Sequence, residues 1–230
     1  MEAAIERGTT KRTRRPRKTE FKVDELPENI RQEVLDRHRY WNVEDIEWWD
    51  CTYINFEEEA KGKGFEIGTK SQRISGGKNY ETPAIYFSGF SSQGDGASFE
   101  ATVDLEKYIK AHVEDLIKAR VDIFTLRKIL NNDSSKDEWY TDTPTIHQND
   151  SHYCHEMTMY CDFMWYGDTP PEIEKTLEQM KDIILEDARD LAKELYKTLE
   201  KENDYLTSDE AIIESLNSND TLFTRDGEDI

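Results

Sequence analysis

Residues 88–98 form a polar, glycine-rich segment in which a protein could hold a ligand or a reacting group. The segment follows the apolar residues Ile85–Phe87, and three glycines interrupt it. Its candidate binding side chains are Ser91, Ser92, Gln93 and Asp95. Because one turn brings backbone amides, small hydroxyls and a carboxylate together, we take these residues as a candidate recognition surface.

The segment does not match the common ligand-binding loops. No lysine follows the glycines, and the expected context is strand–turn–strand, which excludes a phosphate-binding loop. Acidic oxygens do not alternate along it, which excludes a calcium loop. The plainest interpretation is a hairpin turn in which Gly94 and Gly96 adopt positive φ. A recognition surface and a catalytic site remain as alternatives.

A second group of polar residues could supply a metal ligand or a general base. Its members are His147, His152, His155 and Glu156. A strand over residues 152–163 would place His155 on its apolar face, and His152 with Glu156 on the opposite face. We therefore predict no metal site, because zinc needs three or four converging ligands. The remaining hypothesis is that His152 and Glu156 reach Asp95 across the sheet.

The third feature is the acidic C-terminal part of the chain. Residues 168–230 contain 19 Asp and Glu against 7 Lys and Arg. A capping box at Thr169–Glu172 opens a long predicted helix. Its candidate binding residues are Glu178, Asp182 and Glu186. The carboxylates can form a solvated face with pairs to lysines on the same helix. Alternatively, they form a row that imitates the phosphates of a nucleic-acid duplex.

Apolar periodicity and turn residues predict the elements that must position these groups. Helices are expected over 24–39, 43–61 and 105–131, then from Thr169 onward and from Thr207; strands are expected over 65–68, 84–87, 97–103 and 146–165. The fold class is α+β, with an antiparallel sheet of three to five strands packed with several helices, including a long C-terminal one. We expect a disordered basic arm over 1–20, a single α+β domain over 21–220 and a flexible acidic tail over 221–230.

Composition limits the partners and the location of the protein. The net charge is −20, although residues 1–20 hold seven Lys and Arg against three Glu. An acidic body repels nucleic acid and favours a partner with a basic surface, so direct nucleic-acid binding is expected only through the arm. No apolar run could span a bilayer, and no secretory signal is present. The three cysteines lack metal-ligand spacing and fit a reducing cytoplasm. No cofactor is expected.

Several long segments support a family resemblance. They are IYFSGFSSQGDGASFE (85–100), HYCHE (152–156) and YLTSDEAIIESLNSNDTLFTRDG (205–227), with DELPENIRQEV (24–34) and WWDCTYINFEEEAKGKGFEI (48–67). The chain resembles an uncharacterised family of bacteriophage and prophage proteins that is sometimes labelled antitoxin-like. The resemblance implies a phage or prophage origin and a location in the host bacterial cytoplasm, and it implies no particular activity. Ser98 stands where we expect Cys in relatives, which argues against a thiol nucleophile.

The sequence therefore leads to two predictions from different classes. The first is a viral, non-enzymatic acidic accessory protein that binds and modulates a host macromolecule through protein–protein interaction. A host-defence inhibitor and a DNA mimic are its sharper forms. The alternative is a small hydrolase or nucleotide-binding enzyme with a site at the 88–98 turn, His152 and Glu156. A structural or virion-associated role is a third hypothesis. The oligomeric state stays open.

Overall fold

A computed structural model describes residues 19–44, 47–73, 79–130, 143–149 and 153–230. These residues form two compact units where the sequence predicts one domain over 21–220. The central unit extends from Glu47 to Asp204, and the terminal unit holds the described residues before and after it. Helices and antiparallel strands are both abundant, so the α+β class is confirmed. None of the helices in the described part is long and apolar enough to cross a membrane.

The central unit is built on a four-stranded antiparallel sheet in the order β1-β6-β7-β8. Its strands are β1 (Phe65–Ile67), β6 (Ala101–Val103), β7 (Thr145–Gln148) and β8 (Met159–Asp162). Two smaller antiparallel pairs accompany it: β2 (Thr69–Arg73) with β3 (Asn79–Pro83), and β4 (Ile85–Phe87) with β5 (Ala97–Phe99). The predicted strand over 97–103 changes partner at Glu100, because β5 pairs with β4 whereas β6 pairs with β1 and β7.

Strand register separates an apolar face of the sheet from a polar one. One row across the four strands contains Ile67, Ala101, Ile146 and Cys161, and the adjacent row contains Glu66, Thr102, Thr145 and Asp162. Alternate residues of a strand point to opposite faces. The first row therefore belongs to the core and the second lies on the other face.

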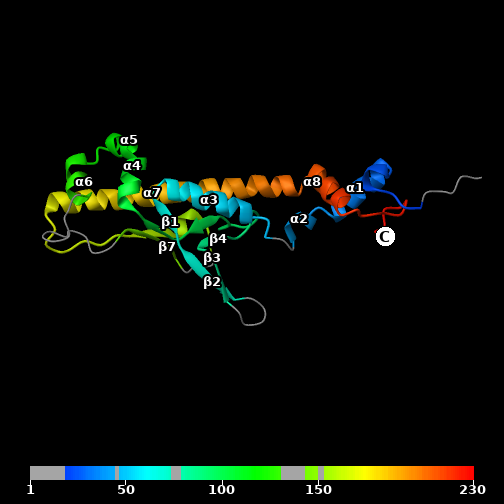
Figure 1. Ribbon diagram of the computed structural model, residues 1–230, viewed down its shortest axis with the longest axis horizontal. Coiled ribbons are helices and arrows are strands. Elements are labelled where there is room, and N and C mark those ends of the chain that lie inside the picture. The colour runs from blue at the N-terminus through cyan, green and yellow to red at the C-terminus, as the bar shows by residue number, and fades with distance from the viewer. Residues whose placement is uncertain (1–18, 45–46, 74–78, 131–142, 150–152) are drawn as a thin grey trace, which may run out of the picture. The chain divides into compact units, whose positions relative to one another are not determined.

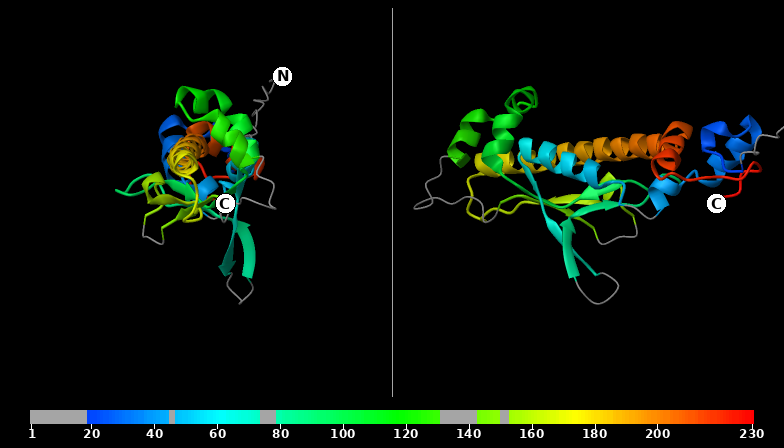
Figure 2. Two further views of the ribbon diagram at one scale, coloured as in Figure 1. Left: turned by 90° about the vertical axis from the view of Figure 1, so that its left-hand side faces the viewer. Right: turned by 45° about the vertical axis from the view of Figure 1, so that its right-hand side comes forward.

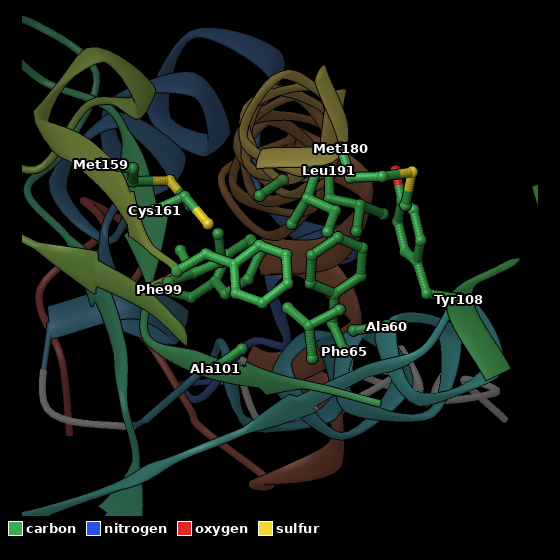
Figure 3. Close-up of a cluster of buried hydrophobic side chains, with 14 of the residues drawn as sticks. Ala60, Phe65, Phe99, Ala101, Tyr108, Met159, Cys161, Met180 and Leu191 are labelled. Carbon is green, nitrogen blue, oxygen red and sulfur yellow. The ribbon is translucent and has the colours of Figure 1, made fainter. Parts of the chain in front are cut away.

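Two helices cover the apolar face of this sheet, α3 (Asp50–Gly62) and α7 (Pro171–Leu206). They lie side by side on one side of the strands, and the β2–β3 hairpin projects on the other side (Figures 1 and 2). In the core, Met180 and Leu191 of α7 face Phe65 and Phe99 of the strands (Figure 3). The predicted apolar stripe of α7 is confirmed, because each of its members is buried: Ile173, Leu177, Met180, Ile184, Ala188, Leu191, Leu195 and Leu199.

The helix predicted over 105–131 is instead broken into three. These are α4 (Leu105–Ala111), α5 (Val113–Lys118) and α6 (Ile123–Leu130). The chain turns at Arg120, whose φ of 58° lies in the left-handed region that ends helices. Asp122 then starts α6, since its carboxylate accepts hydrogen bonds from the backbone amide of Phe124 at 3.0 Å and the hydroxyl of Thr125 at 2.7 Å. Apolar residues recur at helical spacing on both sides of this break, so their periodicity predicts one continuous helix.

The terminal unit contains η1 (Val23–Glu25), α1 (Glu28–Arg37), α2 (Trp41–Glu44) and α8 (Asp209–Ser218). Its core includes Val23, Val34, Ile212, Leu216 and Phe223. Where the sequence predicts a flexible tail over 221–230, Phe223 is fully buried and bridges Phe21. The predicted second helix, over 43–61, does not begin at 43: α2 ends at Glu44 and α3 begins at Asp50.

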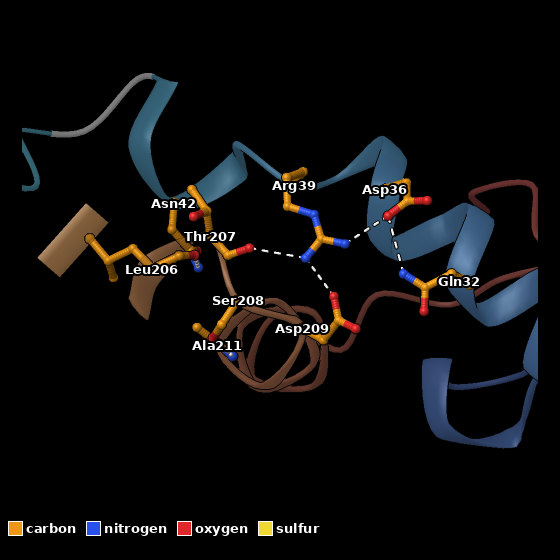
Figure 4. A network of polar contacts seen from close by, with 9 residues as sticks. All are labelled: Gln32, Asp36, Arg39, Asn42, Leu206, Thr207, Ser208, Asp209 and Ala211. Carbon is orange, nitrogen blue, oxygen red and sulfur yellow. Dashed lines mark hydrogen bonds and ion pairs between the residues drawn. The ribbon is translucent and has the colours of Figure 1, made fainter. Parts of the chain in front are cut away.

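A guanidinium connects the segments of the terminal unit (Figure 4). Arg39 donates to the Thr207 carbonyl at 3.0 Å, to Asp36 at 2.7 Å and to Asp209. The hydrogen bond from Arg39 holds the pKa of Asp36 below its usual value. The sequence predicts that the last helix begins at Thr207, and the structure places its cap one residue later. The hydroxyl of Ser208 caps α8, because it accepts a hydrogen bond from the amide of Ala211 at 3.3 Å.

Candidate functional site

The carboxylate of Asp95 stabilises the 88–98 turn from within. It accepts hydrogen bonds from the backbone amides of Ser91 at 2.8 Å and Ser92 at 2.6 Å. The bond from Ser92 is the main cause that lowers the pKa of Asp95, with a smaller contribution from Ser88. Three of the candidate residues of this turn, Ser91, Ser92 and Asp95, therefore bind one another. Gln93 is exposed, as are Ser91 and Ser92.

The glycines of the turn bring it against the segment that follows residue 152. Gly94 has a φ of 96°, and a Cβ there would lie 2.2 Å from the ring of Tyr153. The prediction of positive φ is confirmed for Gly94 and wrong for Gly96. Position 96 favours glycine for a steric reason, because a Cβ there would lie 2.5 Å from the Cα of His155. The turn thus packs tightly on backbone and aromatic atoms.

His147 lies in β7, whereas His155 and Glu156 do not lie in the strand that the sequence predicts over 152–163. β8 begins at Met159, and Glu156–Thr158 form the short helix η2, which His155 caps by accepting from the amide of Met157 at 3.1 Å. The prediction that His155 lies on the apolar face of a strand is therefore wrong, because His155 precedes the short helix η2 and not a strand. His152 lies outside the described residues, so its proposed approach to Asp95 and Glu156 stays a prediction.

Other nucleophiles and metal ligands are also dispersed in the described part of the chain. His147 stacks on Tyr160 with ring centroids 5.3 Å apart. Burial raises the pKa of Cys161 to about 11, which keeps this core thiol neutral. No three His, Cys, Asp or Glu side chains among the described residues are grouped so that they could hold a metal ion.

The acidic face of α7 is the largest array of exposed polar groups that the sequence predicted. Glu178, Asp182 and Glu186 are all exposed, and Asp190 and Glu194 continue them at the same four-residue interval. We call these five residues the carboxylate row. At a rise of about 1.5 Å per residue, neighbouring members lie about 6 Å apart along the helix axis. The row winds slowly around α7 because four residues exceed one helical turn.

The two ends of the carboxylate row differ in their ion pairs. Asp190 pairs with Lys193 at 2.9 Å and Glu194 pairs with Lys197 at 3.0 Å, as the sequence predicts. Glu186 has only longer contacts of 3.8 and 3.9 Å. Within the described residues, Glu178 and Asp182 have no ion pair, so the predicted pairing with lysines of the same helix does not extend to this end of the row.

One carboxylate of α7 turns inward, which periodicity alone did not indicate. The buried Tyr108 donates its hydroxyl hydrogen to Asp187, and the His112 ring stacks on Tyr108 at 4.3 Å. Burial and this hydrogen bond raise the pKa of Tyr108 above its usual value. Asp187 therefore ties α4 to α7, and it does not belong to the exposed row.

These features define a class of protein: an α+β domain with a long helix that presents acidic side chains to solvent. The chain belongs to the family described as a domain of unknown function, DUF8835, which matches residues 48–209. The match covers nearly the whole central unit and ends at the start of α8. Neither a curated protein nor a solved structure matches the chain.

Proposed function

We propose that this protein is a non-enzymatic acidic accessory protein that binds a basic surface of a macromolecular partner through the carboxylate row of α7. The observation that supports this most strongly is the end of the row at Glu178 and Asp182. These side chains are exposed and have no ion pair among the described residues. A partner cation can therefore pair with them without displacing a lysine of α7, whereas it would compete with Lys193 and Lys197 at the other end.

The spacing of the row favours a protein partner over close imitation of DNA. Duplex DNA carries one charge per about 1.7 Å of axis. The row supplies one carboxylate per about 6 Å, which is roughly a quarter of that density. Lysines and arginines of a basic protein surface are separated by distances of this order on helices and strands. We therefore prefer an acidic interaction surface to a DNA mimic.

The enzyme alternative receives less support. It requires Asp95 as a reacting group, and that carboxylate is held by the amides of its own turn. A hydrolase base needs a carboxylate directed at substrate or water. The phage origin and the host cytoplasmic target that the sequence resemblance implies remain part of the proposal, together with inhibition of a host-defence component as its sharpest form.

Capture from host lysate tests the proposal. The immobilised full chain should retain one or a few basic proteins at low ionic strength and release them at about 0.5 M salt, because exposed ion pairs are screened there. Mass spectrometry identifies the retained proteins. An empty capture at low salt contradicts the proposal, as does retention that does not change with salt.

A further inference from the structure

A cavity of about 230 Å³ lies in the central unit, apart from the carboxylate row and the 88–98 turn. The start of α3, the β2–β3 hairpin and β4 enclose it, and its lining includes Asp50, Trp49, Tyr53, Lys70, Thr82 and Phe87. Lys70 and Thr82 belong to none of the sequence motifs, because they lie in the polar hairpin strands β2 and β3. Their approach to α3 depends on tertiary folding.

Lys70 is the cation of this cavity, and it lacks a carboxylate partner. Its ammonium donates a hydrogen bond to the carbonyl of Ile85 and lies 4.1 Å from the centroid of the Tyr86 ring. No carboxylate in the described residues lies within ion-pair distance of it, although the chain contains 50 Asp and Glu. Burial lowers the pKa of Lys70. A partly buried ammonium with a single carbonyl partner can still donate to an anion.

Two hydroxyls beside Lys70 also lack partners. The hydroxyl oxygen of Thr82 forms no hydrogen bond with a described residue, and it is buried too deeply for a ligand in the cavity to reach it. Tyr53 contacts Trp49 through its ring, and no described residue forms a hydrogen bond with its hydroxyl. A buried hydroxyl without a partner costs free energy, about 1–3 kcal/mol. An acceptor group in the cavity would satisfy the Tyr53 hydroxyl and the Lys70 ammonium together.

The cavity also has an acidic side and an apolar wall. Asp50 is exposed and has no ion pair in the described residues, and Glu47 accepts a hydrogen bond from the Tyr80 hydroxyl at 3.3 Å. Neither carboxylate is within 4.0 Å of the Lys70 ammonium. The cavity is therefore lined by a cation and by carboxylates that do not pair with one another. Trp49 and Phe87 supply aromatic surface.

We propose that this cavity binds a small zwitterion with an apolar body, of the class of a free aromatic amino acid. Its carboxylate accepts hydrogen bonds from Lys70 and Tyr53, and its ammonium faces Asp50. Its ring packs between Trp49 and Phe87, where aromatic pairs gain from edge-to-face contact. The volume is below the range of about 300–1,000 Å³ that is typical of drug-sized ligands, which fits a ligand of one residue. A zwitterion has no net charge, so the acidic chain does not repel it.

Calorimetric titration of the full chain with L-phenylalanine, L-tyrosine and L-tryptophan tests this proposal independently of any macromolecular partner. At least one of the three should bind. Its N-acetyl and carboxamide derivatives, which lack the ammonium or the carboxylate charge, should each bind at least about tenfold more weakly, a loss of about 1.4 kcal/mol. The absence of binding by all three amino acids overturns the proposal, as does equal binding of the blocked derivatives.

Variants then locate the site. Lys70→Met should abolish binding, and Asp50→Asn should weaken it about tenfold. The Asp50 side chain makes no hydrogen bond or ion pair with a described residue, so the Asp50→Asn variant reports binding even if Lys70→Met fails to fold. Lys110→Met is the matched control, because Lys110 is exposed on α4 and pairs only with Glu106. Binding that survives in Asp50→Asn at full affinity contradicts the assignment, and so does equal loss in Lys110→Met.

Discussion

The 88–98 turn and the carboxylate row of α7 are both polar, yet they use their polar groups in opposite ways. In the turn, the carboxylate of Asp95 binds the amides of Ser91 and Ser92, and the glycines fit against Tyr153 and His155. In the row, side chains point to solvent, and the end at Glu178 is without an ion pair among the described residues. Polar groups that satisfy one another stabilise a fold, whereas exposed unpaired charges remain free for a partner.

The largest effect on stability should come from filling the space at the turn. Gly96→Ala places a Cβ against the backbone of His155, which cannot move away cheaply. We expect the free energy of unfolding to fall by about 2–3 kcal/mol in urea titration. Gly94→Ala should cost a similar amount, because the φ of Gly94 is positive and a Cβ there would meet the ring of Tyr153. Gly62→Ala is the control, since a Cβ at Gly62 meets nothing within 4 Å. Equal stability of the Gly96 and Gly62 variants would show that the turn does not pack as described.

The inward carboxylate of α7 should matter less than the glycines but more than the exposed row. Tyr108→Phe removes the hydroxyl that donates to Asp187 and leaves the ring in place. We expect a loss of about 1–2 kcal/mol in the free energy of unfolding, the usual cost of a buried hydrogen bond to a charged group. Tyr160→Phe is the control, because Tyr160 is exposed on β8 and its ring packs on His147. A loss below about 0.3 kcal/mol would show that the hydrogen bond between Tyr108 and Asp187 does not stabilise the fold.

Asp95 should show its role through pH. Its pKa is lower in the folded chain than the unfolded value of about 3.9, because backbone amides donate to the carboxylate. The stabilisation is therefore complete above the unfolded pKa and is lost as pH falls through the folded pKa. Asp95→Ala should unfold at a lower temperature than the wild type at pH 7, and this difference should shrink below about pH 4. A difference that stays constant from pH 7 to pH 2 contradicts the assignment.

The carboxylate row should contribute least to stability. Neutralising Glu178, Asp182 and Glu186 together, as Glu178→Gln, Asp182→Asn and Glu186→Gln, changes only exposed groups with weak or no ion pairs. The free energy of unfolding should change by less than about 0.5 kcal/mol, as is usual for surface substitutions. Removing three like charges from an acidic helix can even raise stability. A loss comparable to that of Gly96→Ala would mean that the row supports the fold.

Local signals in the sequence predicted much of this arrangement. The apolar stripe along α7 predicted both the helix and its buried face, and the class α+β followed from the predicted strands. The break at Arg120 could not be predicted, because apolar residues recur at helical spacing on both sides of it. The capping role of His155 was not predicted, because the alternation of faces was applied to a strand from residue 152, and the strand begins only at Met159. Local signals could not predict that Lys70 and Tyr53 line the same cavity, because the tertiary fold brings them together.

Binding by two matched variants tests the central claim most directly. The first is the triple variant of the carboxylate row. The second neutralises three exposed carboxylates of α4 and α5, as Glu106→Gln, Glu114→Gln and Asp115→Asn, and so changes the net charge equally. At low ionic strength, the control should retain the same lysate proteins as the wild type, and the row variant should lose most of them. Equal retention by both variants would contradict the claim that the row is the binding surface. Equal loss by both variants would show that binding depends on net charge and not on the row.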